Sequence, residues 1–221
     1  STDATGVVNG TFSPKDLYLS GSFSHDITDR LRGGISLKAV YSHYDEYTAF
    51  AIATDLGLNY FDPDNDVSLS LVVANLGGQI KRFTDVYNRL PVDVRIGWTQ
   101  GFGEIPLRIS VTAWNLTKWH LPYIDPGDGS SSSVDRVKDS FASNLFRHLV
   151  FGIEFVPSER IYVGLGYNYK TRTDMTSYSR DILSGFSMCA GLNVSRFRIG
   201  AAVSRPHTGA TTFVFNLAMN L

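Results

Sequence analysis

The chain lacks most of the features that would point to a disulfide-linked domain, a nucleic-acid binder or a helical membrane protein. It has one cysteine, Cys189, among 221 residues, so an intrachain disulfide is excluded. Its 20 Lys and Arg balance 21 Asp and Glu, which gives no electrostatic reason to expect nucleic acid as a partner. No stretch approaches the ~20 apolar residues of a transmembrane helix. If the chain crosses a membrane, it does so with strands.

Motifs for catalysis or metal binding are also missing. Asp62, Asp64 and Asp66 have the opening spacing of a calcium loop, but Val67 and Val73 stand where the loop needs a glycine and a closing glutamate. The five histidines are scattered without metal-ligand spacing, and no glycine-rich nucleotide loop is complete. His148 is interpreted as a polar filler or a titrating group. We therefore expect no enzymatic activity, no cofactor and no metal.

Strand periodicity, by contrast, is present along almost the whole chain. In the last segment the apolar residues Phe213, Phe215, Leu217, Met219 and Leu221 alternate with smaller or polar ones. A period of two is the period of a β-strand with one hidden face. The same pattern predicts about eleven strands, near residues 17–24, 35–42, 50–60, 67–74, 92–99, 107–114, 148–155, 161–170, 186–194, 197–204 and 212–221.

Two all-β architectures fit this alternation, a soluble sandwich and a transmembrane barrel. The apolar face is one-sided in every predicted strand, and the other face is small and polar with scattered charges. Every second link between strands is short, as in barrels with periplasmic turns and longer outer loops. Tyr, Phe and Trp collect near the strand ends, where amphipathic rings meet lipid headgroups. These three features favour an antiparallel up-and-down transmembrane β-barrel.

The predicted strand number is odd, whereas single-chain bacterial barrels have even numbers. Residues 1–16 would also fall in an outer loop. The chain starts at Ser1 without a basic and apolar leader, so a signal peptide is absent or already removed. We therefore expect residues 1–221 to be a single domain that forms the C-terminal portion of a longer barrel, with an odd number of N-terminal strands missing.

The segment 117–146 is predicted to be a long outer loop. It opens with an apolar patch that contains Trp119, His120, Pro122 and Tyr123, followed by a run rich in Gly, Ser and Asp. The patch has two interpretations, packing onto the barrel mouth and docking of a partner protein. These four residues are the candidate docking site.

Several segments resemble one known family. The stretches 13–26, 56–62, 75–82, 144–155 and 164–175 are similar to those of the PorQ family, outer-membrane components of the type IX secretion system of Bacteroidetes. The resemblance covers essentially the whole chain and implies a FadL-like barrel of fourteen strands, with three strands and an N-terminal plug region missing upstream. It carries over no catalytic residue, because the family role is that of an anchor.

The resemblance implies a location in the bacterial outer membrane, with lipid or lipopolysaccharide around the barrel. It implies as partners a PorZ-like surface protein, together with PorU and PorV of the complex that attaches secreted cargo. The expected function is therefore a non-enzymatic barrel that anchors a surface partner. Two alternatives stay open: a FadL-like transport channel for small hydrophobic molecules, and a soluble carbohydrate-binding β-sandwich.

Overall fold

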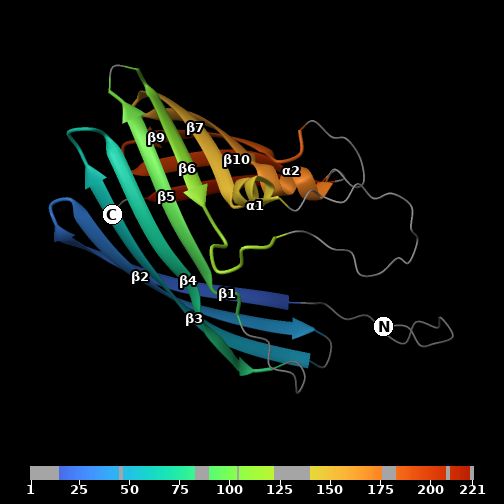
Figure 1. The fold of residues 1–221 in the computed structure, drawn as a ribbon. Helices are drawn as coiled ribbons and strands as arrows, with labels where there is room; N and C mark the ends of the chain where they lie inside the picture. The colour runs from blue at the N-terminus through green and yellow to red at the C-terminus, as the bar shows by residue number, and fades with distance from the viewer. Residues whose placement is uncertain are drawn as a thin grey trace. The chain divides into compact units, whose positions relative to one another are not determined.

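The strands join into one antiparallel sheet in the order of the sequence. The computed structural model describes residues 15–44, 47–82, 90–103, 105–121, 140–175, 183–207 and 210–219. Within these residues 11 strands follow one another from β1 to β11 without a crossover (Figure 1). The prediction of an all-β antiparallel chain of about eleven strands is confirmed at this level. A sandwich needs two packed sheets, and the described strands form one.

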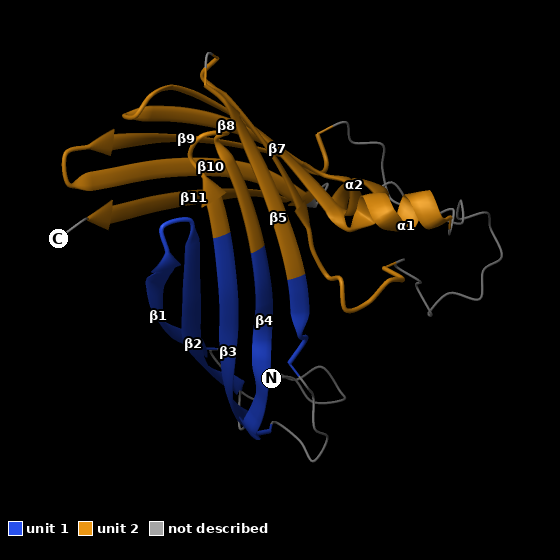
Figure 2. Ribbon diagram, turned by 60° about the vertical axis from the view of Figure 1, so that its left-hand side comes forward, with its two compact units in different colours: residues 1–59, 71–94 blue, residues 60–70, 95–221 orange. Residues whose placement is uncertain are grey.

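The chain forms two compact units, which Figure 2 colours separately. Unit 1 comprises residues 1–59 and 71–94, and unit 2 comprises residues 60–70 and 95–221. Unit 1 holds β1 (Lys15–Thr28), β2 (Leu31–Tyr44) and most of β3 (Tyr47–Asp62) and β4 (Val67–Lys81). Unit 2 holds most of β5 (Asp93–Phe102), then β6 (Leu107–Ala113), β7 (Leu149–Ser158), β8 (Ile161–Asn168), β9 (Phe186–Val194), β10 (Phe197–His207) and β11 (Ala210–Met219).

The strand register of unit 2 places apolar side chains on one common face. Paired residues of neighbouring strands lie on the same face of a sheet. Ile153 of β7 pairs with Ile109 of β6 and Leu165 of β8, and Leu165 pairs in turn with Met188 of β9. The same row continues through Val203 to Phe213, and parallel rows join the remaining apolar residues of these strands. We call this surface the apolar face; most of its large side chains are exposed, Phe215 by 79%.

The opposite surface of unit 2, here called the polar face, is made of small and polar residues. Arg108 pairs with Glu154, Gly152 with Gly166, and Gly191 with Gly200. A Cβ built on Gly152 would overlap the hydroxyl of Ser110. The glycine therefore allows a side chain of the neighbouring strand to lie flat across the sheet.

Unit 1 shows the same division between two faces. Leu17, Leu19 and Phe23 of β1 pair with Tyr41, Ala39 and Ile35 of β2, all on one face. Side chains of the opposite face include three buried alanines of β3, Ala49, Ala51 and Ala53. The amphipathic alternation predicted from the sequence is thus present in both units.

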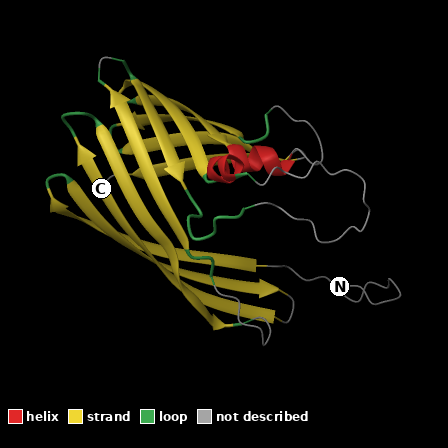
Figure 3. Cartoon of the chain, viewed as in Figure 1, coloured by secondary structure: helices red, strands yellow, loops and turns green. Residues whose placement is uncertain are grey.

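Two short helices depart from the sequence-based expectations. Helix α1 (Phe141–Arg147) overlaps the end of the predicted outer loop 117–146, and α2 (Tyr169–Met175) begins where a strand was expected to continue to Lys170. Both helices lie at one end of the strands of unit 2 (Figure 3). No described helix is long and apolar enough to cross a membrane.

The links between strands also differ in part from the expectation. The five turns expected to be short are short, at 29–30, 63–66, 103–106, 159–160 and 195–196. The links expected at 43–48 and 205–211 shrink to 45–46 and 208–209, because the flanking strands run further than their apolar pattern. The long links therefore lie only between β4 and β5, β6 and β7, and β8 and β9.

Candidate functional site

Helix α1 begins at a local signal in the sequence. Ser140 precedes the helix in an extended conformation, with φ −101° and ψ 153°, and its hydroxyl accepts a hydrogen bond from the Ser143 N–H at 3.2 Å. This is a helix N-cap, which satisfies one of the backbone donors left free at a helix start. The cap fixes where α1 begins and therefore which of its side chains face outward.

An aromatic cluster surrounds α1. The ring of Trp119 lies 5.2 Å from that of Phe141, and Phe146 lies 5.8 Å from Tyr169 and 6.4 Å from Phe151, measured between centroids. These contacts hold the helix against its neighbours. Much of the cluster stays exposed, Phe141 by 71% and Phe146 by 46%. We call the exposed residues Trp119, Phe141, Leu145 and Phe146 the α1 patch.

The four predicted docking residues are distributed unevenly over this region. Trp119 belongs to the α1 patch, and His120 beside it is exposed. Pro122 and Tyr123 lie outside the described residues. Trp119 is both packed on neighbouring rings and 39% exposed, so both interpretations of the loop, packing and docking, remain compatible with its position.

The contribution of α1 to this surface was not predicted from the sequence. The sequence pattern that indicates this helix is short: Ser140 as a cap, followed by apolar residues at 141 and 145, four positions apart. Seven residues are too few for helical periodicity to stand out in a chain dominated by strands.

His148 ties α1 to the segment that follows β6. The residue is fully buried and forms the C-cap of α1. Its ring nitrogens lie 2.8 Å (Nδ1) and 3.0 Å (Nε2) from the carbonyl oxygens of Trp114 and Trp119, and the Trp119 ring stacks on it at 5.3 Å. The prediction that a strand begins at His148 is wrong, because this residue caps α1 and β7 begins at Leu149. Its contacts fit the interpretation as a polar filler.

The polar face of unit 2 carries two hollows. One, of about 520 Å³, is lined by side chains that include Asp66, Thr99, Arg108 and Glu154. Arg108 Nη1 and Glu154 Oε2 lie 3.6 Å apart, and both side chains are more than 40% exposed, so this ion pair is weak. A second hollow, of about 240 Å³, lies beside Cys189, a free and half-buried thiol.

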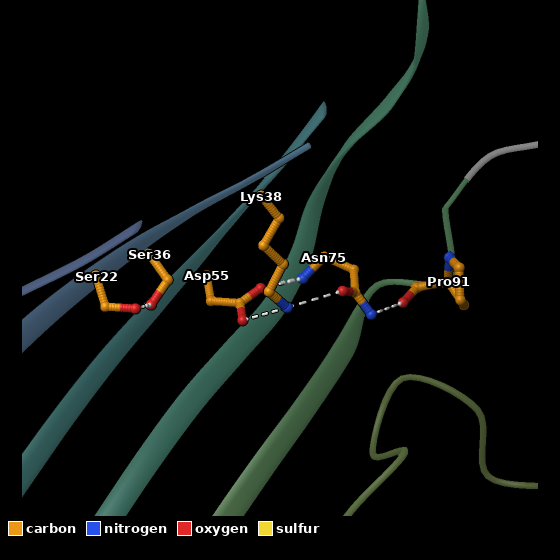
Figure 4. A network of polar contacts seen from close by, with 6 residues as sticks. All are labelled: Ser22, Ser36, Lys38, Asp55, Asn75 and Pro91. Carbon is orange, nitrogen blue, oxygen red and sulfur yellow. Dashed lines mark hydrogen bonds and ion pairs between the residues drawn. The ribbon is translucent and has the colours of Figure 1, made fainter. Parts of the chain in front are cut away.

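In unit 1 a polar network supports a bend in β4. Lys38 forms an ion pair with Asp55 and donates a hydrogen bond to Asn75 Oδ1 at 3.3 Å (Figure 4). Asn75 donates its backbone N–H to Asp55 at 2.8 Å and its side-chain amide to the Pro91 carbonyl at 3.0 Å. Asn75 has φ +62°, a left-handed conformation that Asn tolerates better than most residues. These contacts join three strands of unit 1 to Pro91, which lies shortly before β5.

Among the residues that the structure describes, no group of three His, Cys, Asp or Glu side chains could hold a metal ion. No model of a known protein family matches the chain, and no curated protein matches it. The features that bear on function are therefore the apolar face, the polar face and the α1 patch.

Proposed function

We propose that this chain forms part of an outer-membrane β-barrel whose apolar face contacts lipid. The observation that carries the proposal is the continuity of that face. In the paired rows of β6 to β11 its members are apolar, apart from the residues beyond the register shifts at Ser158 and His207, and no Asp, Glu, Lys or Arg interrupts them. Water would strongly disfavour so large an exposed apolar surface, whereas lipid chains cover it without cost.

Strand length agrees with this role. A tilted strand crosses a bilayer with about 9–11 residues. Strands β5, β7, β9, β10 and β11 have 9 to 11 residues, and β1 to β4 have 14 to 16, whereas β6 and β8 are shorter, with 7 and 8. The polar face then lines the interior, where small residues, hydroxyl groups and the Arg108–Glu154 pair are compatible with water.

The barrel serves as a non-enzymatic anchor for a surface partner, in the manner implied by the resemblance to the PorQ family of the type IX secretion system. The α1 patch supports this role, because it exposes Phe141 and Phe146 at the end of unit 2 that bears the long links. Exposed aromatic residues beside packed ones are typical of docking surfaces. A PorZ-like surface protein, with PorU and PorV, is the proposed set of partners.

The docking role is tested by co-purification from outer membranes of a PorQ-bearing bacterium. Replacing Phe141 and Phe146 by Ser is expected to lower partner recovery at least about tenfold, since buried aromatic anchors dominate interface energy. The matched control replaces Phe61 and Phe102 by Ser, two exposed aromatic residues beside the turns 63–66 and 103–106, changes that leave the α1 patch intact. Equal partner recovery from wild type and from the Phe141→Ser, Phe146→Ser variant would exclude this patch.

A FadL-like channel for small hydrophobic molecules is the second candidate function. The feature that favours it is the hollow of about 240 Å³ beside Cys189, whose lining includes Val150, Leu165 and Ala202. Blocking that hollow with Ala202→Trp would stop uptake of a hydrophobic dye into vesicles if the protein is a channel. If vesicles that contain the wild-type protein do not take up the dye, the channel function is excluded and anchoring is the function.

A further inference from the structure

The most buried side chains of unit 2 are polar. Four polar residues of this unit are at most 2% exposed: Asn144, Arg147, His148 and Ser184. The buried hydrophobic residues within the described part of the chain are, by contrast, four alanines of unit 1. A hydrophobic core therefore does not explain why these four positions are closed off from water.

All four residues lie at one end of unit 2. Ala113 at the end of β6 pairs with Leu149 at the start of β7, and Tyr167 at the end of β8 pairs with Phe186 at the start of β9. Both helices extend from these strand ends (Figure 3). We call this region, residues 113–121, 140–150, 167–175, 183–187 and 204–207, the helical end.

Arg147 is the exceptional member of this group. Its side chain is fully buried, and its three guanidinium nitrogens have no hydrogen-bond acceptor among the described residues. An arginine stays protonated in proteins, so it cannot avoid the cost of burial by losing its charge. A buried cation is stable only when it is paired and hydrogen-bonded. His148 supplies no acceptor, because both its ring nitrogens are engaged with carbonyl groups.

Lys118, Lys170, Arg172 and Arg205 are the other cationic side chains among the described residues of the helical end, and three of them have interactions of their own. Ser184 brings a second buried group without a partner, its hydroxyl, to the same end.

We propose that Arg147 is the centre of a binding site for a phosphate group at the helical end. A phosphate oxygen pair matches the planar fork of a guanidinium, and the remaining oxygens can accept hydrogen bonds from neighbouring N–H or hydroxyl groups. The opposite side of α1 is lightly covered, as the exposure of Phe141 and Phe146 indicates, and local opening of this short helix is the proposed route of access. The site does not depend on the proposed anchoring role.

The test follows thermal unfolding of the purified full chain in detergent micelles, with sodium chloride exchanged for sodium phosphate at constant ionic strength. The wild-type midpoint is expected to rise with phosphate, because a ligand that binds only the folded state stabilises it. Arg147→Met is expected to weaken the apparent phosphate affinity at least about tenfold. Arg32→Met, which removes an exposed arginine of unit 1, is the control and keeps the response.

Two further arms identify the source of the phosphate. Glucose 6-phosphate represents a soluble phosphate ester, and phosphatidylglycerol added to the micelles represents a lipid headgroup. A response to either supports the site and names its class of ligand. A wild-type midpoint that is the same in chloride, phosphate, glucose 6-phosphate and phosphatidylglycerol overturns the proposal.

If Arg147→Met fails to fold, hydrogen exchange measured on the wild-type protein tests the site instead. Phosphate is expected to slow exchange of backbone amides within 141–149 selectively, and uniform or absent protection overturns the site. If a carboxylate of the chain itself pairs with Arg147, Arg147→Met is strongly destabilised in chloride and phosphate has no effect on the wild type. That combination also contradicts the proposal.

Discussion

Two neighbouring alanines of β10 allow a direct test of what covers the apolar face. Ala201 lies on that face, between Ala190 of β9 and Phe215 of β11, and Ala202 lies on the polar face, between Cys189 and Val214. The two residues occupy the middle of the strand Phe197–His207 and differ only in the side to which they point. We therefore compare Ala201→Arg with Ala202→Arg.

The expected magnitude follows from the surroundings of each position. Ala201 is exposed, so its replacement loses almost no packing, and the whole effect is the transfer of a guanidinium group. Ala201 is four positions from Phe197, where the strand begins. This is about 13 Å along a strand, which is further than an arginine side chain reaches. In lipid the cost is then about 2–4 kcal/mol, whereas at a water-exposed site it stays within about 0.5 kcal/mol. Ala202 lines the hollow of about 240 Å³, so Ala202→Arg is expected to cost about 1 kcal/mol or less.

The assay is guanidinium unfolding of each variant in phospholipid vesicles, followed by tryptophan fluorescence. A free energy of unfolding that is lower by about 2–4 kcal/mol for Ala201→Arg alone supports lipid on the apolar face. Repeating the titration in shorter-chain lipid should reduce the penalty, because the charge lies nearer to water. If Ala201→Arg and Ala202→Arg have the same small effect, the reasoning about the two faces is refuted.

Three further changes test individual contacts. Gly77→Ala is expected to destabilise the protein by about 1–3 kcal/mol, because the new Cβ overlaps a backbone carbonyl of β3, while Gly21→Ala, with open space around it, should be neutral or slightly stabilising in the same unfolding assay. His148→Ala should cost about 2–4 kcal/mol by removing a buried ring that lies between the carbonyl oxygens of Trp114 and Trp119; no change in the unfolding midpoint would show that the ring does not tether α1. Arg32 donates two hydrogen bonds to the carboxylate of Asp26, but both side chains are largely exposed, so Asp26→Asn should lower the unfolding midpoint only slightly; a loss as large as that of Gly77→Ala would contradict this.

The α1 patch shows which part of a candidate site could be predicted from the sequence. Trp119 and His120 stood out as apolar and aromatic residues in a region without strand periodicity. Phe141 and Phe146 did not, because seven residues of helix leave too little pattern to separate them from the loop. The position of His148 was wrong for the same reason, since the alternation of β7 was extended one residue too far toward α1.

The strands themselves, with their two faces, were determined by the sequence alone. Alternation with a period of two depends only on the backbone geometry of a strand, so Phe213, Phe215 and Leu217 could be placed on one face without any knowledge of their partners. Leu221, the last member of that row, lies outside the described residues. The tight turns followed in the same way, from short gaps between periodic segments.

Only the tertiary structure decided how neighbouring strands and strand ends meet. Register brought Ile109, Ile153 and Leu165 into one row, and the bend at Asn75 depends on Lys38 and Asp55 of other strands. The burial of Arg147 belongs to the same class. Arg147 directly follows the predicted outer loop 117–146, and nothing in the neighbouring sequence indicates that its side chain is buried. In the folded chain the side chain is closed off from water. Such features depend on contacts between residues far apart in the chain, which local periodicity does not encode.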